Sequence, residues 1–180
     1  MPLREYINLF KGELIMGEKT MANLAEAFSG ESQANRKYLF YSEVADKEGF
    51  TSVAKLFRAA AAAETLHAKT HYRNMGKICD TETNLKDAIA GETYEYTEMY
   101  PPFIDDAEAE GEKKAHKGFS LANEVEKVHA ELYKRALEHL SEKRAVDYYL
   151  CTVCGHIEEG AAPDKCPVCG APSKAYELVE

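Results

Sequence analysis

The 180-residue sequence has no tryptophan and no long apolar run. A membrane-spanning helix needs about 20 consecutive apolar residues, so the sequence argues against a transmembrane protein and against a membrane partner. Residues 1–17 also lack the apolar core and the small-residue cleavage site of a signal peptide, so we expect an unprocessed, cytoplasmic protein. Hydrophobic residues still form 45% of the chain, which is enough for a buried core.

Basic residues are in short supply. The chain has 22 lysines and arginines against 31 acidic residues, and its formal net charge is −9. Recognition of nucleic acid needs a basic face against the phosphates, so this balance argues against a nucleic-acid partner. At 180 residues, the chain has room for one full domain and a small appendage.

Cysteine is almost absent from the first 150 residues. Four of the five cysteines follow Leu150, whereas five of the six histidines precede it. Without an export signal, cysteines indicate metal or thiol chemistry rather than disulfides. We therefore predict two sites with different ligands, in a helical domain over residues 1–145 and a small metal-binding domain over residues 146–180.

From about Lys19 to Asp147 the sequence reads as helices. Apolar residues recur every three or four positions in four successive segments, as in amphipathic helices. Gly49, Gly76 and Gly111 stand where glycines would end the first three of them. The sequence therefore predicts a mainly α protein built on a four-helix bundle.

Other local signals refine the helix boundaries. Thr51 and Asn84 are candidate N-terminal caps of the second and third helices. Pro101 and Pro102 lie inside the third periodic segment, and the pattern resumes directly after them. We expect a kink at this point rather than the end of a helix.

The helical region contains an internal repeat. Residues 30–31 match residues 91–92, and the segment 64–68 matches 126–130, at offsets of 61 and 62 residues. Two related helical hairpins would bring the matched residues face to face at the centre of a bundle. The matched set consists of two carboxylates and two Glu-x-x-His pairs, namely Glu31 and Glu92, Glu64 with His67, and Glu126 with His129.

These glutamates occupy helix positions that should face the core. A single helical glutamate usually points to water, but an ionised carboxylate buried without a partner costs several kcal/mol. The same helix stripes offer no lysine or arginine, which leaves metal binding. One glutamate from each of two helices, with a Glu-x-x-His pair from each of the other two, is the ligand arrangement of di-iron carboxylate proteins. Oxygen and nitrogen ligands favour iron or manganese over a closed zinc site.

Glu95 breaks the repeat. It lies one turn from Glu92, whereas the first half has Gln33 and Ala34 at the corresponding place. We therefore expect one additional carboxylate on one side of the site, which suits alternative coordination states during redox turnover. A solvated helix acid is the competing interpretation.

Two tyrosines lie two turns beyond matched glutamates. Tyr38 follows Glu31 and Tyr100 follows Glu92 on the same helix faces. Both can donate hydrogen bonds to ligand carboxylates, although an ordinary core tyrosine fits almost as well. The sequence gives no support for the histidines at positions 71, 116 and 139 as ligands.

Two Cys-x-x-Cys-Gly motifs end the chain. Each lets two thiolates hold one ion, and its glycine permits the turn that directs backbone N–H groups at sulfur. Alone, such a module is equally a structural zinc ribbon or a one-iron electron carrier. A redox site upstream favours iron, because turnover at two irons needs electrons delivered singly. The predicted ligands are Cys151, Cys154, Cys166 and Cys169, and Cys79 is interpreted as a bystander.

Over residues 19–180 the chain closely resembles rubrerythrin. The resemblance rests on residues 30–34 (GESQA), on residues 91–101, on both Glu-x-x-His pairs and on the cysteine motifs. It implies a ferritin-like di-iron domain followed by a rubredoxin-like iron domain. It also implies a peroxidase that reduces hydrogen peroxide to water and protects against oxidative stress.

The resemblance implies a role for each ligand. Glu64 and Glu126 would bridge the two irons, with Glu31 and Glu92 as terminal ligands. A histidine at position 129 would bind one iron. The other iron would move between the histidine at position 67 in the reduced state and the glutamate at position 95 in the oxidised state.

This sequence also departs from the pattern of free-standing rubredoxin. The spacing between its two cysteine motifs is much shorter, and His156 stands where an aromatic residue often follows the first motif's glycine. Both departures bear on the reduction potential of an iron held by the four cysteines.

The resemblance to rubrerythrin also leads us to expect a redox partner and a second copy of the chain. The sequence contains no nucleotide-binding motif, so electrons would come from NAD(P)H through a separate reductase or a rubredoxin. In a ferritin-like arrangement the connector between helices two and three would link ends about 28 Å apart. Residues 76–83 span roughly 30 Å only when almost fully extended. We therefore expect a homodimer, and hypothesise that its copies exchange helical hairpins.

Two alternatives use the same residues. The first is a ferroxidase or iron-handling protein, which oxidises iron and passes it on. The second is a non-enzymatic scaffold in which the cysteines hold a structural zinc ion.

Overall fold

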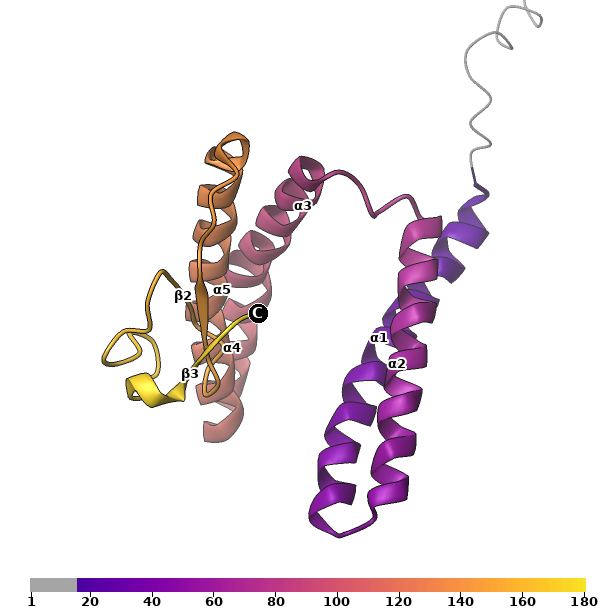
Figure 1. Cartoon of the computed structure of the whole chain (residues 1–180), viewed down its shortest axis with the longest axis horizontal. Helices are drawn as coiled ribbons and strands as arrows, with labels where there is room; N and C mark the ends of the chain where they lie inside the picture. The colour runs from indigo at the N-terminus through magenta and orange to yellow at the C-terminus, as the bar shows by residue number, and fades with distance from the viewer. Residues whose placement is uncertain (1–15) are drawn as a thin grey trace, which may run out of the picture. The chain divides into compact units, whose positions relative to one another are not determined.

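The computed structural model describes residues 16–180, and the chain divides into two compact units at Ile78 (Figure 1). The first unit ends with this residue and the second extends from Cys79 to Glu180. Helices dominate both, so the expected mainly α class is confirmed. No helix of residues 16–180 is long and apolar enough to cross a membrane.

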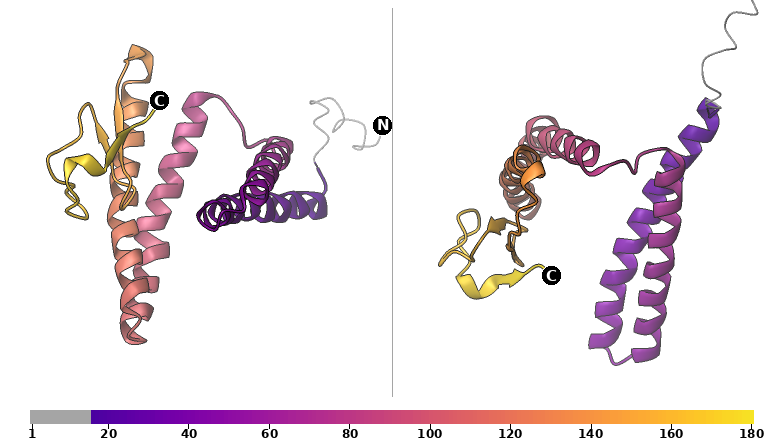
Figure 2. Two further views of the ribbon diagram at one scale, coloured as in Figure 1. Left: turned by 60° about the horizontal axis from the view of Figure 1, so that its bottom comes forward. Right: turned by 45° about the horizontal axis from the view of Figure 1, so that its top comes forward.

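The first unit is a helical hairpin of α1 (Glu18–Lys47) and α2 (Thr51–Asn74), which lie side by side in Figure 1 and in the right view of Figure 2. Small side chains let the two helices approach closely. Ala54, Ala61 and Ala68 recur every seven residues along α2 and are buried. Asn35 of α1 links the two helices, because its side-chain amide donates a hydrogen bond to the Ala61 carbonyl oxygen of α2 at 2.7 Å.

The glycine stops are confirmed. Gly49, Gly76 and Gly111 have φ values of 84°, 70° and 74°, in the left-handed region that favours glycine at helix ends.

The predicted N-terminal caps are wrong. Phe50 precedes α2, so Thr51 is its first helical residue rather than its cap. At α3 (Thr81–Tyr94), the cap is Asp80, whose carboxylate accepts the Thr83 N–H at 2.8 Å. Asn84 instead bonds backward through its side-chain amide to the backbone of Cys79. Aspartate and asparagine are both favoured at the N-cap of a helix, and in α3 this position is occupied by Asp80.

The second unit begins with a helix that changes pitch midway. α3 runs into the π-helical turn η1 (Glu95–Met99) and then into α4 (Tyr100–Ala109). Within this turn the Tyr100 N–H bonds the Glu95 carbonyl five residues back. Pro101 and Pro102 have no N–H to donate to the preceding turn, which explains why the widened turn lies just before them. The expected continuation through the two prolines is confirmed.

The unit continues with α5 (Lys113–Glu138), the 3₁₀ turn η2 (Leu140–Glu142) and the cysteine module, residues 146–180. Its sheet has the order β2-β1-β3 and is antiparallel, with β1 at Tyr148–Cys151, β2 at Ile157–Glu159 and β3 at Tyr176–Leu178. The 3₁₀ turn η3 (Ser173–Ala175) leads into β3. Cys151, Cys166 and Tyr176 form the buried core of the cysteine module. The domain boundary at residue 145 stays a prediction.

Candidate metal centres

The hairpin unit brings together Glu31 of α1 with Glu64 and His67 of α2. We call these three residues the hairpin cluster, and one ligand atom from each lies within 4.8 Å of the others. His67 Nδ1 is 3.0 Å from a Glu64 carboxylate oxygen and 3.7 Å from one of Glu31. The spacing of three residues on α2 produces this pairing, because it puts both side chains on one helix face.

The two carboxylates of the hairpin cluster share a proton-binding site. A hydrogen bond to Glu64 raises the pKa of Glu31, and the same bond, together with His67, lowers the pKa of Glu64. Of the two carboxylates, Glu31 is therefore the one with the greater tendency to bind a proton. A cation at this place would favour the ionised form of both carboxylates, which could then serve as oxygen ligands.

The second unit repeats the arrangement with Glu92 of α3 and with Glu126 and His129 of α5. These residues form the α5 cluster, with ligand atoms again within 4.8 Å of one another. His129 Nδ1 lies 2.8 Å from a Glu126 oxygen, the counterpart of the contact between His67 and Glu64. The predicted Glu-x-x-His pairs therefore both place their carboxylate against Nδ1.

His129 has a second partner that the sequence repeat does not contain. Its Nε2 lies 3.0 Å from the carbonyl oxygen of Gly155, the glycine that follows Cys154. The carbonyl oxygen can only accept, so Nε2–H donates to it, and Nδ1, which faces Glu126, is the ring nitrogen that could bind a metal ion. A metal-binding histidine normally donates its other ring N–H in this way.

The α5 cluster is more strongly perturbed than the hairpin cluster. Burial, and then the charge of Glu126, raises the pKa of Glu92 to about 7. Burial lowers the pKa of His129, but the hydrogen bonds with Glu126 and Gly155 outweigh it and raise the pKa overall. Without a cation, this cluster therefore retains protons that a metal ion would replace.

Two further predicted residues, Glu95 and Tyr100, lie close enough to Glu126 to feel its charge. Glu95 lies on η1 outside the three-residue α5 cluster, and its pKa is raised first by burial and then by the charge of Glu126. Tyr100 packs against Phe119 and has its pKa raised by burial and by the nearby carboxylates.

Tyr38 belongs to an aromatic group instead. Its ring centroid lies 6.4 Å from that of Tyr41 and 6.2 Å from that of Phe57. The roles of Tyr38 and Tyr100 toward ligand carboxylates stay predictions.

Sequence reasoning missed two groups near the α5 cluster. The pKa of Tyr133 is raised by burial and then by the charges of Glu92 and Glu126. Its position one turn beyond His129 could have revealed it. The Gly155 carbonyl carried no such signal, because its contact with His129 joins residues 26 positions apart.

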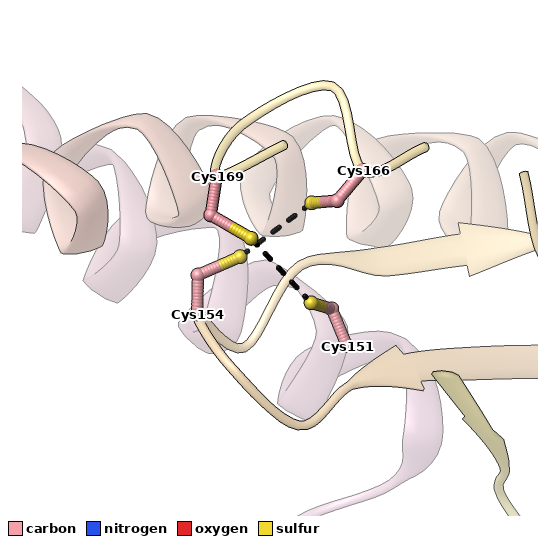
Figure 3. A group of neighbouring side chains, drawn as sticks. All are labelled: Cys151, Cys154, Cys166 and Cys169. Atoms are coloured by element: carbon pink, nitrogen blue, oxygen red, sulfur yellow. Dashed lines mark hydrogen bonds between the residues drawn. The ribbon is translucent and has the colours of Figure 1, made fainter. Parts of the chain in front are cut away.

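The four cysteines converge from two loops (Figure 3). The sulfur atoms of Cys151 and Cys169 are 3.8 Å apart, and those of Cys154 and Cys166 are 3.7 Å apart. A tetrahedral ion with metal–sulfur bonds of about 2.3 Å requires sulfur–sulfur distances near 3.8 Å. The residues present therefore fit one tetrahedral iron or zinc ion.

One of the four cysteines has a pKa below the usual value of a thiol. Burial raises the pKa of the Cys166 thiol, but the Cys169 N–H, the Tyr176 hydroxyl and the Val168 N–H outweigh it and hold the pKa at about 6. Burial raises the pKa of Cys154 far above its usual range. One thiolate is thus favoured before a metal binds, and the ion must drive the ionisation of its partners.

Comparison with known proteins identifies the family. Residues 22–137 match the family model described as rubrerythrin, and residues 149–177 match the rubrerythrin rubredoxin-like domain. The chain belongs to the rubrerythrin family. Membership confirms the ferritin-like fold class with a rubredoxin-like module, and with it a non-haem di-iron centre and one iron in a four-cysteine site.

Individual relatives cover nearly the whole chain. Rubrerythrin-1 of Clostridium acetobutylicum is 35% identical over 188 residues, covering 92% of this chain and 96% of the relative. Nigerythrin of Nitratidesulfovibrio vulgaris is 34% identical over 173 residues, covering 87% and 85%. A solved structure of fully reduced, all-ferrous nigerythrin covers 95% of this chain and 91% of its own, at 31% identity and a TM-score of 0.56.

Proposed function

We propose that this protein is a rubrerythrin-type peroxidase that reduces hydrogen peroxide to water and protects against oxidative stress. Each turnover consumes one peroxide, two electrons and two protons and yields two waters. Iron at the carboxylate–histidine clusters supplies two electrons and a Lewis acid when bound. The electrons are then replaced one at a time through the four-cysteine site, ultimately from an external NAD(P)H-dependent reductase or a rubredoxin.

One contact carries this proposal more than any other. His129 of the α5 cluster is hydrogen-bonded to Gly155, next to Cys154. The carboxylate–histidine chemistry and the thiolate chemistry therefore meet within one compact unit. A structural zinc ribbon has no need of such a contact, whereas an electron relay does.

The residues around the clusters have defined tasks in this proposal. Nδ1 of His129 and Nδ1 of His67 serve as nitrogen ligands, with Glu31, Glu64, Glu92 and Glu126 as oxygen ligands. Glu95 is the additional carboxylate, available on η1 for the oxidised state. Glu92, with a pKa of about 7 in the metal-free protein, is a group that can exchange protons near neutral pH.

We further propose that the hairpin cluster and the α5 cluster complete one site in a homodimer with exchanged hairpins. Support comes from the hairpin unit, which by itself leaves large apolar side chains exposed. Phe40 and Leu56 are 60% and 67% exposed in the chain, and they are accompanied by Tyr41, Val44, Phe50, Val53 and Leu66. Such a surface favours burial against another helical pair.

Steady-state turnover tests the peroxidase. Iron-loaded protein is mixed with NADH, a flavoprotein rubredoxin reductase and hydrogen peroxide, and NADH and peroxide are followed together. We expect equal amounts of both to be consumed over many turnovers, without oxygen release. Cys154→Ser, which removes a thiolate of the relay, should lose steady turnover and still consume peroxide once when chemically reduced.

Other outcomes identify the alternatives. Peroxide consumption that stops after one turnover with the reductase present would favour a ferroxidase. A colourless protein that contains zinc at the cysteines after iron-replete expression would favour the scaffold.

A further inference from the structure

The loop between β1 and β2 presents one backbone oxygen to the α5 cluster. The carbonyl oxygen of Gly155 accepts a hydrogen bond from Nε2–H of His129 at 3.0 Å. The His129 side chain is only 18% exposed, so water has little access to take the place of this carbonyl. Because Nδ1 faces Glu126, the orientation of the ring toward a metal ion depends on the group that holds Nε2.

Backbone hydrogen bonds hold Gly155 in place. Its N–H donates to the Cys151 carbonyl oxygen at 2.9 Å, and the Cys151 N–H donates to the His156 carbonyl oxygen at 2.8 Å. The His156 ring is anchored as well, since its Nδ1 lies 2.9 Å from the hydroxyl oxygen of Tyr176. Gly155 has a φ of 87°, a conformation that other residues rarely adopt. The direction of its carbonyl is therefore set by the conformation of the loop that carries Cys151 and Cys154.

The same loop lies directly against α5. A Cβ atom added to Gly155 would lie 3.8 Å from Cγ1 of Val125, which is 2% exposed and directly precedes Glu126. Arg135 of α5 and Glu159 of β2 form a second, looser contact at 3.5 Å. The loop and the helix that carries the α5 cluster are thus in contact, and a change in the loop reaches the imidazole without an intermediate residue.

The cysteine module has little to stabilise this loop apart from its metal ligands. Its buried core consists of Cys151, Cys166 and Tyr176, and the first two of these are ligands. A module as small as residues 146–180 rarely folds on its hydrophobic core alone. An ion bound by four thiolates supplies folding free energy to such a module. We therefore expect the loop to hold the Gly155 carbonyl firmly only when the four-cysteine site binds an ion.

From these contacts we propose that the Gly155 carbonyl couples the two metal centres of this unit, so that an ion at the four cysteines strengthens metal binding at the α5 cluster. Gly155 is a positioning residue and acts through His129. The coupling is reciprocal, because a metal ion at the α5 cluster must raise the affinity of the cysteines by the same factor.

The size of the coupling follows from the role of the carbonyl. Loss of an outer partner of a ligating histidine costs about 10- to 100-fold in metal affinity, and we expect about tenfold here. Under the proposed function, a chain that lacks its electron relay would then hold iron less tightly at His129.

The hairpin cluster provides an internal control. The His67 side chain is 57% exposed, and its contacts with Glu31 and Glu64 both run through Nδ1. These three residues belong to the other unit of the chain. Metal binding that depends on His67 as its imidazole ligand should therefore not respond to an ion at the cysteines.

The test is a titration of the reduced, full-length protein with Mn²⁺, followed by the electron paramagnetic resonance signal of the free ion. Each variant is measured with one equivalent of Zn²⁺ and without zinc, because thiolates select Zn²⁺ whereas carboxylate-rich sites accept Mn²⁺. His67→Ala leaves His129 as the imidazole ligand, and zinc should strengthen its Mn²⁺ binding about tenfold. His129→Ala is the matched control with the same cysteine module, and zinc should change its Mn²⁺ binding by less than about twofold.

Equal effects of zinc in the two variants, or no effect of zinc in His67→Ala, would overturn the coupling. If His67→Ala binds Mn²⁺ too weakly to be titrated, the reciprocal measurement decides. Saturating Mn²⁺ should raise the Zn²⁺ affinity of the wild-type cysteines about tenfold in competition with a zinc-selective chelator, and should not raise that of His129→Ala. An unchanged wild-type Zn²⁺ affinity would overturn the coupling. No peroxide is used, so failure of the proposed peroxidase activity would leave this result unaffected.

Discussion

The hairpin cluster and the α5 cluster use the same three ligand types at matching positions of a repeat, yet their surroundings differ. The His67 side chain is 57% exposed, and its contacts with Glu31 and Glu64 both run through Nδ1. The His129 side chain is 18% exposed and has partners at both ring nitrogens. The sequence repeat thus places the same residue types in both clusters, but the contacts that hold the two histidines differ.

In the proposed function, this difference would suit the two histidines to different tasks. His129 is anchored through Gly155 to the module that carries the cysteines, so electrons would arrive on its side. The exposed His67 has no comparable clamp among the contacts described above, which suits a ligand that is released and regained. Glu95 also lies on the α5 side, and the π-helical turn that carries it is absent from α1 and α2 as described by the structure.

Loss of one carboxylate from either cluster should have a large effect on turnover. Glu64→Ala removes a carboxylate from the hairpin cluster, and Glu126→Ala removes its counterpart from the α5 cluster. Each variant alone should lose at least about 100-fold in peroxide turnover, since even an outer partner of a metal ligand is worth 10- to 100-fold. The cysteine iron should remain in both, as visible absorption and metal analysis will report.

Mixed dimers of these two variants then test the exchange. Co-expression with two affinity tags isolates a dimer with one copy of each. With exchanged hairpins, one site carries both substitutions and the other carries none, so about half of the wild-type turnover should return. Without an exchange every site carries one substitution, and a mixed dimer as inactive as its parents would rule out shared sites.

A smaller effect concerns the carboxylate that the hairpin lacks. If Glu95 is the proposed oxygen ligand of one oxidation state, Glu95→Gln should slow the reaction of the reduced protein with peroxide by about tenfold while leaving iron content intact. Gln33→Glu is the control, since it places an acid in the corresponding region of α1. We expect its rate within twofold of wild type, measured by stopped flow. An unimpaired Glu95→Gln variant would restore the interpretation of Glu95 as a solvated acid.

Local spacing carried most of what the sequence predicted correctly. The Glu-x-x-His pairs and the Cys-x-x-Cys-Gly motifs each bring two candidate ligands together within one turn or loop, so this proximity needs no knowledge of the fold. Glycine stops are equally local, because a left-handed residue such as Gly49 is costly for any other side chain.

Features that depend on competition or on distant residues were not predictable. Asp80 and Asn84 are both good capping residues, and their sequence positions alone do not rank them. Two prolines predict an irregular helix, but not that the irregularity takes the form of a π-helical turn around Glu95. The partners of His129 and His156 lie 26 and 20 residues away, and no local pattern encodes either contact.

The two clusters should also differ in how the pH changes the stability of the metal-free protein. Glu92 has a pKa of about 7 in the folded, metal-free protein against a usual value of 4.5, so the fold binds its proton more tightly than the unfolded chain does. Its contribution is therefore fully present below pH 4.5 and is lost as the pH rises from there through 7. Because the side chain is partly exposed, we expect a loss of only about 1–2 kcal/mol between pH 5 and pH 8.

Urea unfolding of the metal-free protein at these two pH values measures this loss. Glu92→Gln keeps the shape of the protonated side chain and should remove the decline that this group causes. In the hairpin cluster, the raised pKa of Glu31 is opposed by the lowered pKa of Glu64, so Glu31→Gln should follow the wild-type pH profile closely. The titration of the four thiols is common to all three proteins and cancels in the difference. Equal pH profiles for Glu92→Gln and wild type would mean that the α5 cluster is no more perturbed than the hairpin cluster.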